Sequence, residues 1–191
     1  MLTLKLQHAP AQTFTAGDDA LGYLCDTVVV DARHQPLQLR LQKKGQGESW
    51  GAVYADFRQA YDKVESRSTG LSVRAEYPSG MKTGNRYKVR YYISADRDYE
   101  FVTLVVPRPA ATEPVEQRPG CRWASGLSYY RQVHDATAEL CFSRIPRGDY
   151  LIEEDIYVER NGSYHTGVAV IRCDYAEEFQ GHSADGVVEI K

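Results

Sequence analysis

The chain has 191 residues, a formal net charge of -3 at pH 7 and 42% hydrophobic residues. This length suits one large domain or two small ones. The near-neutral charge argues against a nucleic-acid-binding domain, which would carry a basic patch or a high pI. No apolar run is long enough to span a bilayer, and the first residues alternate like a strand without the apolar centre of a signal peptide. We therefore expect no membrane contact by this segment and no signal peptide in this chain.

The first part of the chain, residues 1–58, contains short alternating segments that are typical of strands. We predict strands at residues 2–6, 23–30, 37–41 and 49–54. So few strands make part of a sandwich but not a whole one, since about three or more are needed for independent stability. We expect an incomplete sheet whose exposed edge invites pairing with another molecule.

Residues 59–69 are interpreted as a linker. The stretch from 55 to 68 holds neither Gly nor Pro, and Phe57, Tyr61 and Val64 recur at a weakly helical spacing. A strand and a short helix both remain open here.

The strongest β signal lies at residues 84–106. Tyr87, Val89, Tyr91 and Ile93 fall on one side of an alternating pattern, and polar residues mostly fall on the other. A period of two with β-branched and aromatic residues predicts a half-buried strand, and residues 99–106 predict a second, central one. These two strands are expected in the core of an all-β domain.

The corner between these two strands is Asp96-Arg97-Asp98. We predict a structural role for it, in which the carboxylates accept backbone N–H bonds and Arg97 bridges to a carboxylate. Calcium is the alternative, because hard oxygen clusters suit that ion. The other acidic cluster, at residues 153–155, is divided between the two faces of a strand, so a solvated face with ion pairs is favoured. We predict no metal and no cofactor.

Residues 107–126 contain four prolines, which exclude a central strand and predict a long ordered loop or a crossover between sheets. Further strands are predicted at residues 127–133, 137–143, 150–160, 164–175 and 187–190. Asn161-Gly162 predicts a hairpin between the two long strands that flank it. Residues 70–191 are thus predicted to form an antiparallel sandwich of about eight strands.

Sequence motifs for catalysis are missing, and we predict that the chain is not an enzyme. His134 and Asp135 are adjacent at a strand end, so their side chains point to opposite faces and do not pair as base and orienting acid. The chain has no GxSxG, P-loop or HExxH pattern.

Cysteines and exposed aromatic residues leave alternatives open. None of the cysteines has CxxC spacing, so buried small hydrophobic residues are favoured over zinc or redox sites, and one disulfide remains open. They are Cys25, Cys121, Cys141 and Cys173. Trp50, Trp123, Tyr129 and Tyr130 form either an interface or ordinary sandwich core.

Several short motifs, in order, resemble the C-terminal region of bacterial alpha-2-macroglobulin-like proteins. They are ADRDYEFV from Ala95, GLSYY from Gly126, IPRGDY from Ile145, CDYAEEF from Cys173 and His182-Ser183. SWGAVY from Ser49 resembles the strand that closes the CUB-like domain of that family. The resemblance implies a partial CUB-like β-segment at residues 1–58 and an immunoglobulin-like, macroglobulin-type β-sandwich at residues 70–191.

The resemblance also implies a function: a non-catalytic C-terminal part of a protease-trapping protein, an endopeptidase inhibitor. Its partners would be the thioester and CUB domains of the parent chain, which would meet target proteases and lie in the periplasm or cell envelope. The segment that faces the thioester in the family supplies the candidate interdomain contact. Its residues here are Asp174, Tyr175, Glu178, Phe179 and His182. The alternative is a stand-alone sandwich that acts as an adhesion or ligand-binding module.

The sequence departs from the family pattern in two ways. Asp174 and Glu177 stand where the family has methionine and proline, and a charge at Asp174 weakens a role in keeping water off a thioester. The family's Cys-Gly-Glu-Gln motif and a bait region are absent from this sequence.

Overall fold

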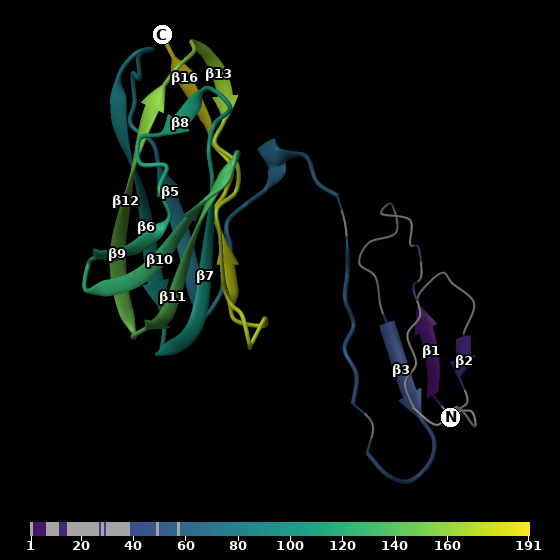
Figure 1. Cartoon of the computed structure of the whole chain (residues 1–191). Helices are drawn as coiled ribbons and strands as arrows, with labels where there is room; N and C mark the ends of the chain where they lie inside the picture. The colour runs from purple at the N-terminus through teal and green to yellow at the C-terminus, as the bar shows by residue number, and fades with distance from the viewer. Residues whose placement is uncertain are drawn as a thin grey trace. The chain divides into compact units, whose positions relative to one another are not determined.

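The computed structural model describes residues 2–6, 12–14, 27, 29, 39–48, 50–56 and 58–191. The chain forms two compact units, Met1–Asp56 and Phe57–Lys191 (Figure 1). The strand predicted at residues 23–30 lies outside the described residues except for Thr27 and Val29, which are not in a strand.

The first unit contains a three-stranded antiparallel sheet in the order β2-β1-β3. These strands are β1 (Leu2–Leu6), β2 (Gln12–Phe14) and β3 (Leu39–Lys43). The predicted N-terminal partial sheet is thereby confirmed. The strand predicted at residues 49–54 is wrong, because residues 50–56 are described and form no strand. Alternation gives a segment the propensity for a strand, but a strand also needs a partner backbone.

The second unit begins with a single 3₁₀ turn, η1 (Tyr61–Lys63), and is otherwise built from strands. The strands are β4 (Arg67–Thr69), β5 (Leu71–Glu76), β6 (Arg86–Ala95), β7 (Tyr99–Pro107), β8 (Thr112–Pro114), β9 (Gly120–Ala124), β10 (Leu127–Val133), β11 (Thr137–Ile145), β12 (Gly148–Val158), β13 (Gly162–His165), β14 (Val170–Cys173), β15 (Gln180–His182) and β16 (Val187–Ile190). Within the described part of the chain, no helix is long and apolar enough to cross a membrane.

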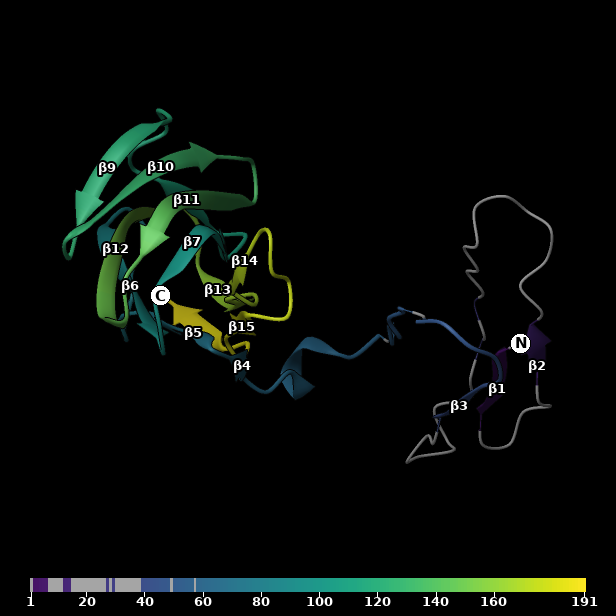
Figure 2. The same ribbon diagram turned by 90° about the horizontal axis from the view of Figure 1, so that it is seen from below.

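These strands form an antiparallel β-sandwich, which confirms the predicted fold class. One layer has the order β8-β12-β6-β5 and the other β14-β7-β11-β10-β9, and β4 and β15 join them along one side. Figure 2 looks along the sandwich and shows the two layers face to face. Alternate side chains from both layers fill the core, among them Ile93, Leu104, Phe142 and Ile152, each at most 2% exposed.

The side at which the layers join depends on two glycines. Gly70 turns the chain between β4 and β5 with a φ of +76°, and a Cβ there would lie 2.0 Å from the Tyr99 hydroxyl. A Cβ on Gly181 in β15 would lie 2.2 Å from the carbonyl oxygen of Leu71. Glycine is therefore favoured at Gly70 by its positive φ and by the nearby Tyr99 side chain, and only glycine allows the backbone at Gly181 to approach that of Leu71 this closely.

The hairpin predicted around Asn161-Gly162 is wrong. β12 pairs with β6 and β8, β13 pairs with β16, and β14 pairs with β7 and β15. Because β12 already has partners on both sides, the chain after Gly162 crosses to another strand. Gly167, with a φ of +76°, lies where the predicted strand at residues 164–175 is interrupted.

The proline-rich stretch at residues 107–126 contains two short strands, β8 and β9, and both lie at the ends of the strand order. Proline is tolerated at such edges because its missing N–H faces no partner strand. The predicted exclusion from the centre of the sheet is confirmed.

A buried ion pair links the two layers. Arg131 of β10 donates to Glu154 of β12 through Nε and Nη2, at 2.9 Å to Oε1 and 2.6 Å to Oε2, and its Nη1 donates to the carbonyl of Glu116. The two side chains are only 4% and 11% exposed. If one residue of this pair were replaced, the remaining charge would lose its partner and would still be buried away from water.

We therefore expect Glu154→Gln to lower the free energy of unfolding by about 3–5 kcal/mol, because it leaves the Arg131 charge buried and uncompensated. The double variant Arg131→Met with Glu154→Leu should recover most of that loss. Urea unfolding followed by circular dichroism measures both. Lys88→Ala, which removes an exposed pair with Glu153, is the matched control and should leave stability almost unchanged. A Glu154→Gln loss no larger than that of the control would contradict the assignment.

Candidate functional site

The candidate segment at residues 173–179 is a tight loop between β14 and β15. The N–H of Ala176 donates to the carbonyl of Cys173, the N–H of Phe179 to Ala176, and the N–H of Cys173 to Phe179. These backbone bonds close the loop on itself and fix which side chains face outward.

Asp174 is held by partners on the sandwich. Thr103 Oγ1 donates to its Oδ2 at 2.8 Å, and Arg172 Nε lies 3.4 Å from its Oδ1. Its backbone N–H donates to the carbonyl of Phe101 at 2.8 Å. The Asp174 carboxylate, at the position where the resemblance has methionine, thus connects the loop to β7 and β14.

The most exposed feature of the site is an aromatic pair. The rings of Phe101 and Tyr175 meet edge to face, with centroids 5.1 Å apart and planes at 86°. Their exposed fractions are 51% and 83%. Phe101 has a φ of +54°, which is rare for a residue other than glycine and strained for an aromatic one.

Phe101 was not predicted from the sequence as a site residue, because its pattern is that of any apolar residue in a central strand. A left-handed backbone at a non-glycine residue leaves no signal in an alternating pattern. The only available clue was its position inside the ADRDYEFV motif.

The other candidate contact residues are placed differently. Phe179 turns inward, with its ring centroid 5.4 Å from that of Tyr99 and the Arg97 guanidinium 5.0 Å above it. Glu178 is exposed on the loop. His182 lies on β15, where its Nδ1 is 3.1 Å from the carbonyl of Ser183. The structure thus brings Tyr175 together with Phe101 and assigns Phe179 a packing role.

The corner at residues 96–98 is a network of ion pairs. Arg97 binds both oxygens of Asp96, at 3.0 and 3.1 Å. The Tyr99 hydroxyl donates to Asp96 at 2.6 Å. Hydrogen bonds from Arg97 and then from Tyr99 lower the pKa of Asp96, whereas burial and the Asp96 charge raise the pKa of Tyr99 to about 12.

Asp98 connects the same corner to the turn between β11 and β12. It accepts the backbone N–H of Arg147 at 2.9 Å and a bond from the Arg144 guanidinium. The Arg147 N–H and then Arg144 lower the pKa of this carboxyl. All charges of the corner have protein partners.

The second acidic cluster is divided by its strand. Glu153 and Asp155 pair with Lys88 at 3.2 and 3.5 Å on the outer face. Glu154 faces the interior and pairs with Arg131. Among the described residues, no group of three metal-ligating side chains converges.

The aromatic residues singled out in the sequence have different environments. Tyr129 is core, at 6% exposed, whereas Trp123 and Tyr130 are 72% and 43% exposed on β9 and β10. Cys121 and Cys141 face Tyr130 from the strands on either side of it. Cys121, Cys141 and Cys173 are free thiols, and Cys25 lies outside the described residues.

The second unit is thus an antiparallel sandwich whose layers are joined along one side, with an ion-paired corner and a loop that bears the aromatic pair. Residues 57–178 match the family model described as the bacterial alpha-2-macroglobulin MG10 domain. The match spans more than half of the chain, and the chain belongs to this family.

Solved structures of bacterial macroglobulins share the fold. The alpha-2-macroglobulin of Salmonella reacted with methylamine aligns with a TM-score of 0.56 and 14% identity, over 67% of this chain and 10% of that one. Trypsin-activated alpha-2-macroglobulin from Escherichia coli aligns with a TM-score of 0.56 and 8% identity, over 67% of this chain and 11% of that one. At these identities the likeness concerns the fold alone. The alignment covers about a tenth of the length of these chains, and no curated protein matches the sequence.

The Asp98 contacts predict an acid-dependent part of the stability. A carboxyl with a lowered folded pKa contributes stability that is present above its unfolded pKa of about 4 and lost as pH falls through the folded pKa. We expect Asp98→Asn to lower the melting temperature at pH 7, with the gap to the parent protein closing as the pH falls through the lowered folded pKa of Asp98. Thermal melts between pH 7 and pH 2.5 test this, with Asp149→Asn as the control. A gap that is constant across this range would show that the ionised form has no special role.

Proposed function

We propose that the chain is a non-catalytic C-terminal part of a bacterial alpha-2-macroglobulin-like protease-trapping protein, and that the Phe101–Tyr175 pair packs against the thioester domain of its parent. The observation that carries this proposal is the exposed edge-to-face pair, which the structure holds in place from both sides. Strained backbone fixes Phe101, and the Asp174 contacts fix the loop that bears Tyr175.

Burial of the pair supports a docking role energetically. Two aromatic side chains at these exposures offer on the order of 250 Å² of accessible surface, or about 6 kcal/mol at 25 cal/mol per Å² before the costs of association. Since the two rings already pack against each other, part of their ordering entropy is lost before binding.

The proposed role contains no chemistry of its own. A thioester needs a cysteine joined to a glutamine side chain within a tight turn, and no cysteine in this sequence has a glutamine within three residues. The domain would therefore be a docking surface that requires no cofactor. Target proteases would be reached only through the parent protein.

The remaining parts of the proposal follow from the family. The parent would lie in the periplasm or cell envelope. Its CUB-like domain would include residues 1–58, with residues 59–69 as the linker to the sandwich at 70–191.

The test is binding of the chain to the isolated thioester domain of the same parent, measured by isothermal titration calorimetry. Phe101→Ser and Tyr175→Ser should each weaken binding at least tenfold, because each removes half of the docking pair. Tyr157→Ser is the matched control: Tyr157 is a partly exposed aromatic residue in the opposite layer, on β12, and its loss should leave binding unchanged.

Equal effects from all three variants would contradict the assignment of the surface. Stoichiometric inhibition of a protease by this chain alone would contradict the wider proposal, because it would make the chain an inhibitor in its own right.

A further inference from the structure

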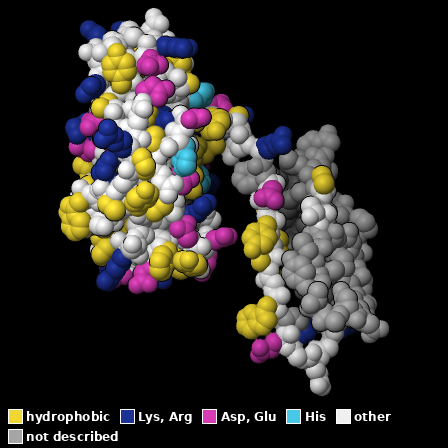
Figure 3. Space-filling model, viewed as in Figure 1, with side chains coloured by type: hydrophobic (Ala, Val, Ile, Leu, Met, Phe, Trp, Pro, Cys, Tyr) yellow, Lys and Arg dark blue, Asp and Glu magenta, His cyan; other side chains and the backbone are white. Residues whose placement is uncertain are grey.

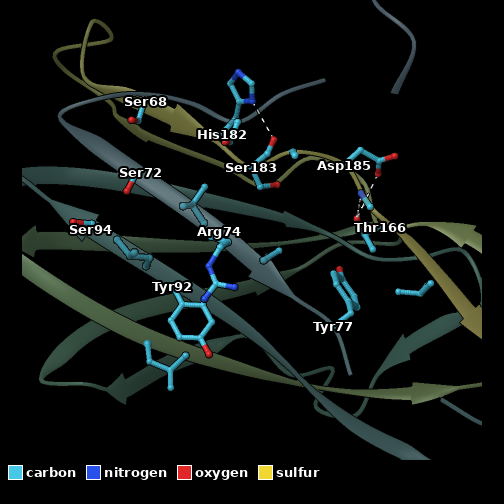
Figure 4. A pocket seen from close by; sticks show the side chains of 18 of the residues that line it. Ser68, Ser72, Arg74, Tyr77, Tyr92, Ser94, Thr166, His182, Ser183 and Asp185 are labelled. Carbon is cyan, nitrogen blue, oxygen red and sulfur yellow. Dashed lines mark hydrogen bonds between the residues drawn. The ribbon is translucent and has the colours of Figure 1, made fainter. Parts of the chain in front are cut away.

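A groove of about 1300 Å³ follows β5. Residues 72–75 form one wall and residues 182–189 form the other. Figure 4 shows Ser183 and Asp185 above β5, and Arg74 and Tyr92 on the far side of it. We call this hollow the β5 groove.

The backbone of β5 is paired on one side only. All of β5 pairs with β6, but β4 pairs with it only where Thr69 faces Leu71. The N–H of Asp96 donates to the carbonyl of Gly70, so hydrogen-bonded pairs alternate from that point along β5. In this register the N–H and C=O groups of Val73 and Ala75 face the groove, and no hydrogen bond between described residues reaches them.

An unpaired strand edge is a template for another extended segment. The chain carries such a segment at residues 50–56, which form no strand. Trp50, Val53 and Tyr54 are 91%, 63% and 80% exposed. Figure 3 shows hydrophobic side chains at the surface of the first unit, Met1–Asp56.

We propose that two copies of this chain associate by exchange, each adding residues 50–56 as a strand to the β5 groove of the other. The exchange is isologous, so it closes at a dimer. It concerns a different face from the Phe101–Tyr175 pair and does not rest on the function proposed for that pair.

Side chains of the segment fit the groove by their alternation. Trp50 and Tyr54 share one face and reach the outer surface of the layer, where the Arg74 guanidinium lies 4.1 Å from the centroid of the Tyr92 ring. Gly51 and Val53 share the other face, where small side chains meet the buried Val73. Strand addition thus places the aromatic side chains beside a cation–π pair and the small ones toward the core.

The area that would be buried favours a second copy as the occupant. Burying two aromatic residues and one valine from each copy, with the matching groove surface, removes roughly 1,500 Å² in total. That area lies in the range of stable interfaces, about 1,200–2,000 Å².

Sedimentation equilibrium of the full chain tests the proposal, and we expect a dimer. Ala75→Pro removes the N–H that faces the groove, while the bonds of Arg74 and Glu76 to β6 remain. Trp50→Ser combined with Tyr54→Ser removes the anchors of the segment. Each change should raise the dissociation constant at least tenfold, and circular dichroism should show that both variants stay folded.

Mixing the two variants gives the sharpest result. One retains an intact segment and the other an intact groove, so a heterodimer should form although neither variant dimerises well alone. If Ala75→Pro does not fold, a peptide of residues 47–57 replaces it and should dissociate the parent dimer and bind the segment variant. Trp123→Ser, which removes another exposed tryptophan that lies outside the groove, should leave the dimer intact.

A monomer at all concentrations would overturn the proposal. So would a dimer that survives the loss of Trp50 and Tyr54, because it would have to use another surface.

Discussion

The close packing at Gly70, against the Tyr99 side chain, and at Gly181, against the Leu71 backbone, is the constraint on which the sandwich depends. It lets β4 and β15 run between the layers, so that β5 and β14 are joined along one side. A side chain at either position would meet the Tyr99 hydroxyl or the Leu71 carbonyl and force the layers apart. The loop at residues 173–179 and the corner at residues 96–98 adjoin this seam through Phe179 and Tyr99. The geometry of the candidate site is therefore set by the same closure that completes the core.

Elements with a strict alternation could be predicted from the sequence, whereas their partners could not. The strands at residues 127–133 and 137–145 follow from period-two patterns, and the prolines placed residues 107–126 outside the centre of a sheet. The hairpin predicted at Asn161-Gly162 was wrong because the turn preference of these two residues is local. The pairing of β12 is decided by its long ladder with β6 and a short one with β8, which supply more backbone bonds than a two-residue turn can outweigh.

The candidate site was predictable only where motif order carries information. Tyr175 was placed on the loop by its motif, but its partner Phe101 depends on a positive φ that no residue pattern encodes. The charge of Asp174 argued against a role in keeping water off a thioester, because the sequence does not show the partners of its carboxylate. Thr103 and Arg172 come from β7 and β14, so only the folded chain shows that the carboxylate is engaged.

The Arg131–Glu154 pair has a consequence for misfolding. Side chains of a strand change faces with every residue, so a slip of β12 by two positions against β6 would keep its apolar side chains in the core but place Ile152 or Ile156 opposite Arg131, which would then be buried without a counterion. An apolar pair at the same place would tolerate such an error, because neighbouring aliphatic residues could substitute for one another. The ion pair thus favours one alignment of β12, because a sandwich misaligned by two residues would contain an uncompensated buried charge and would be less stable.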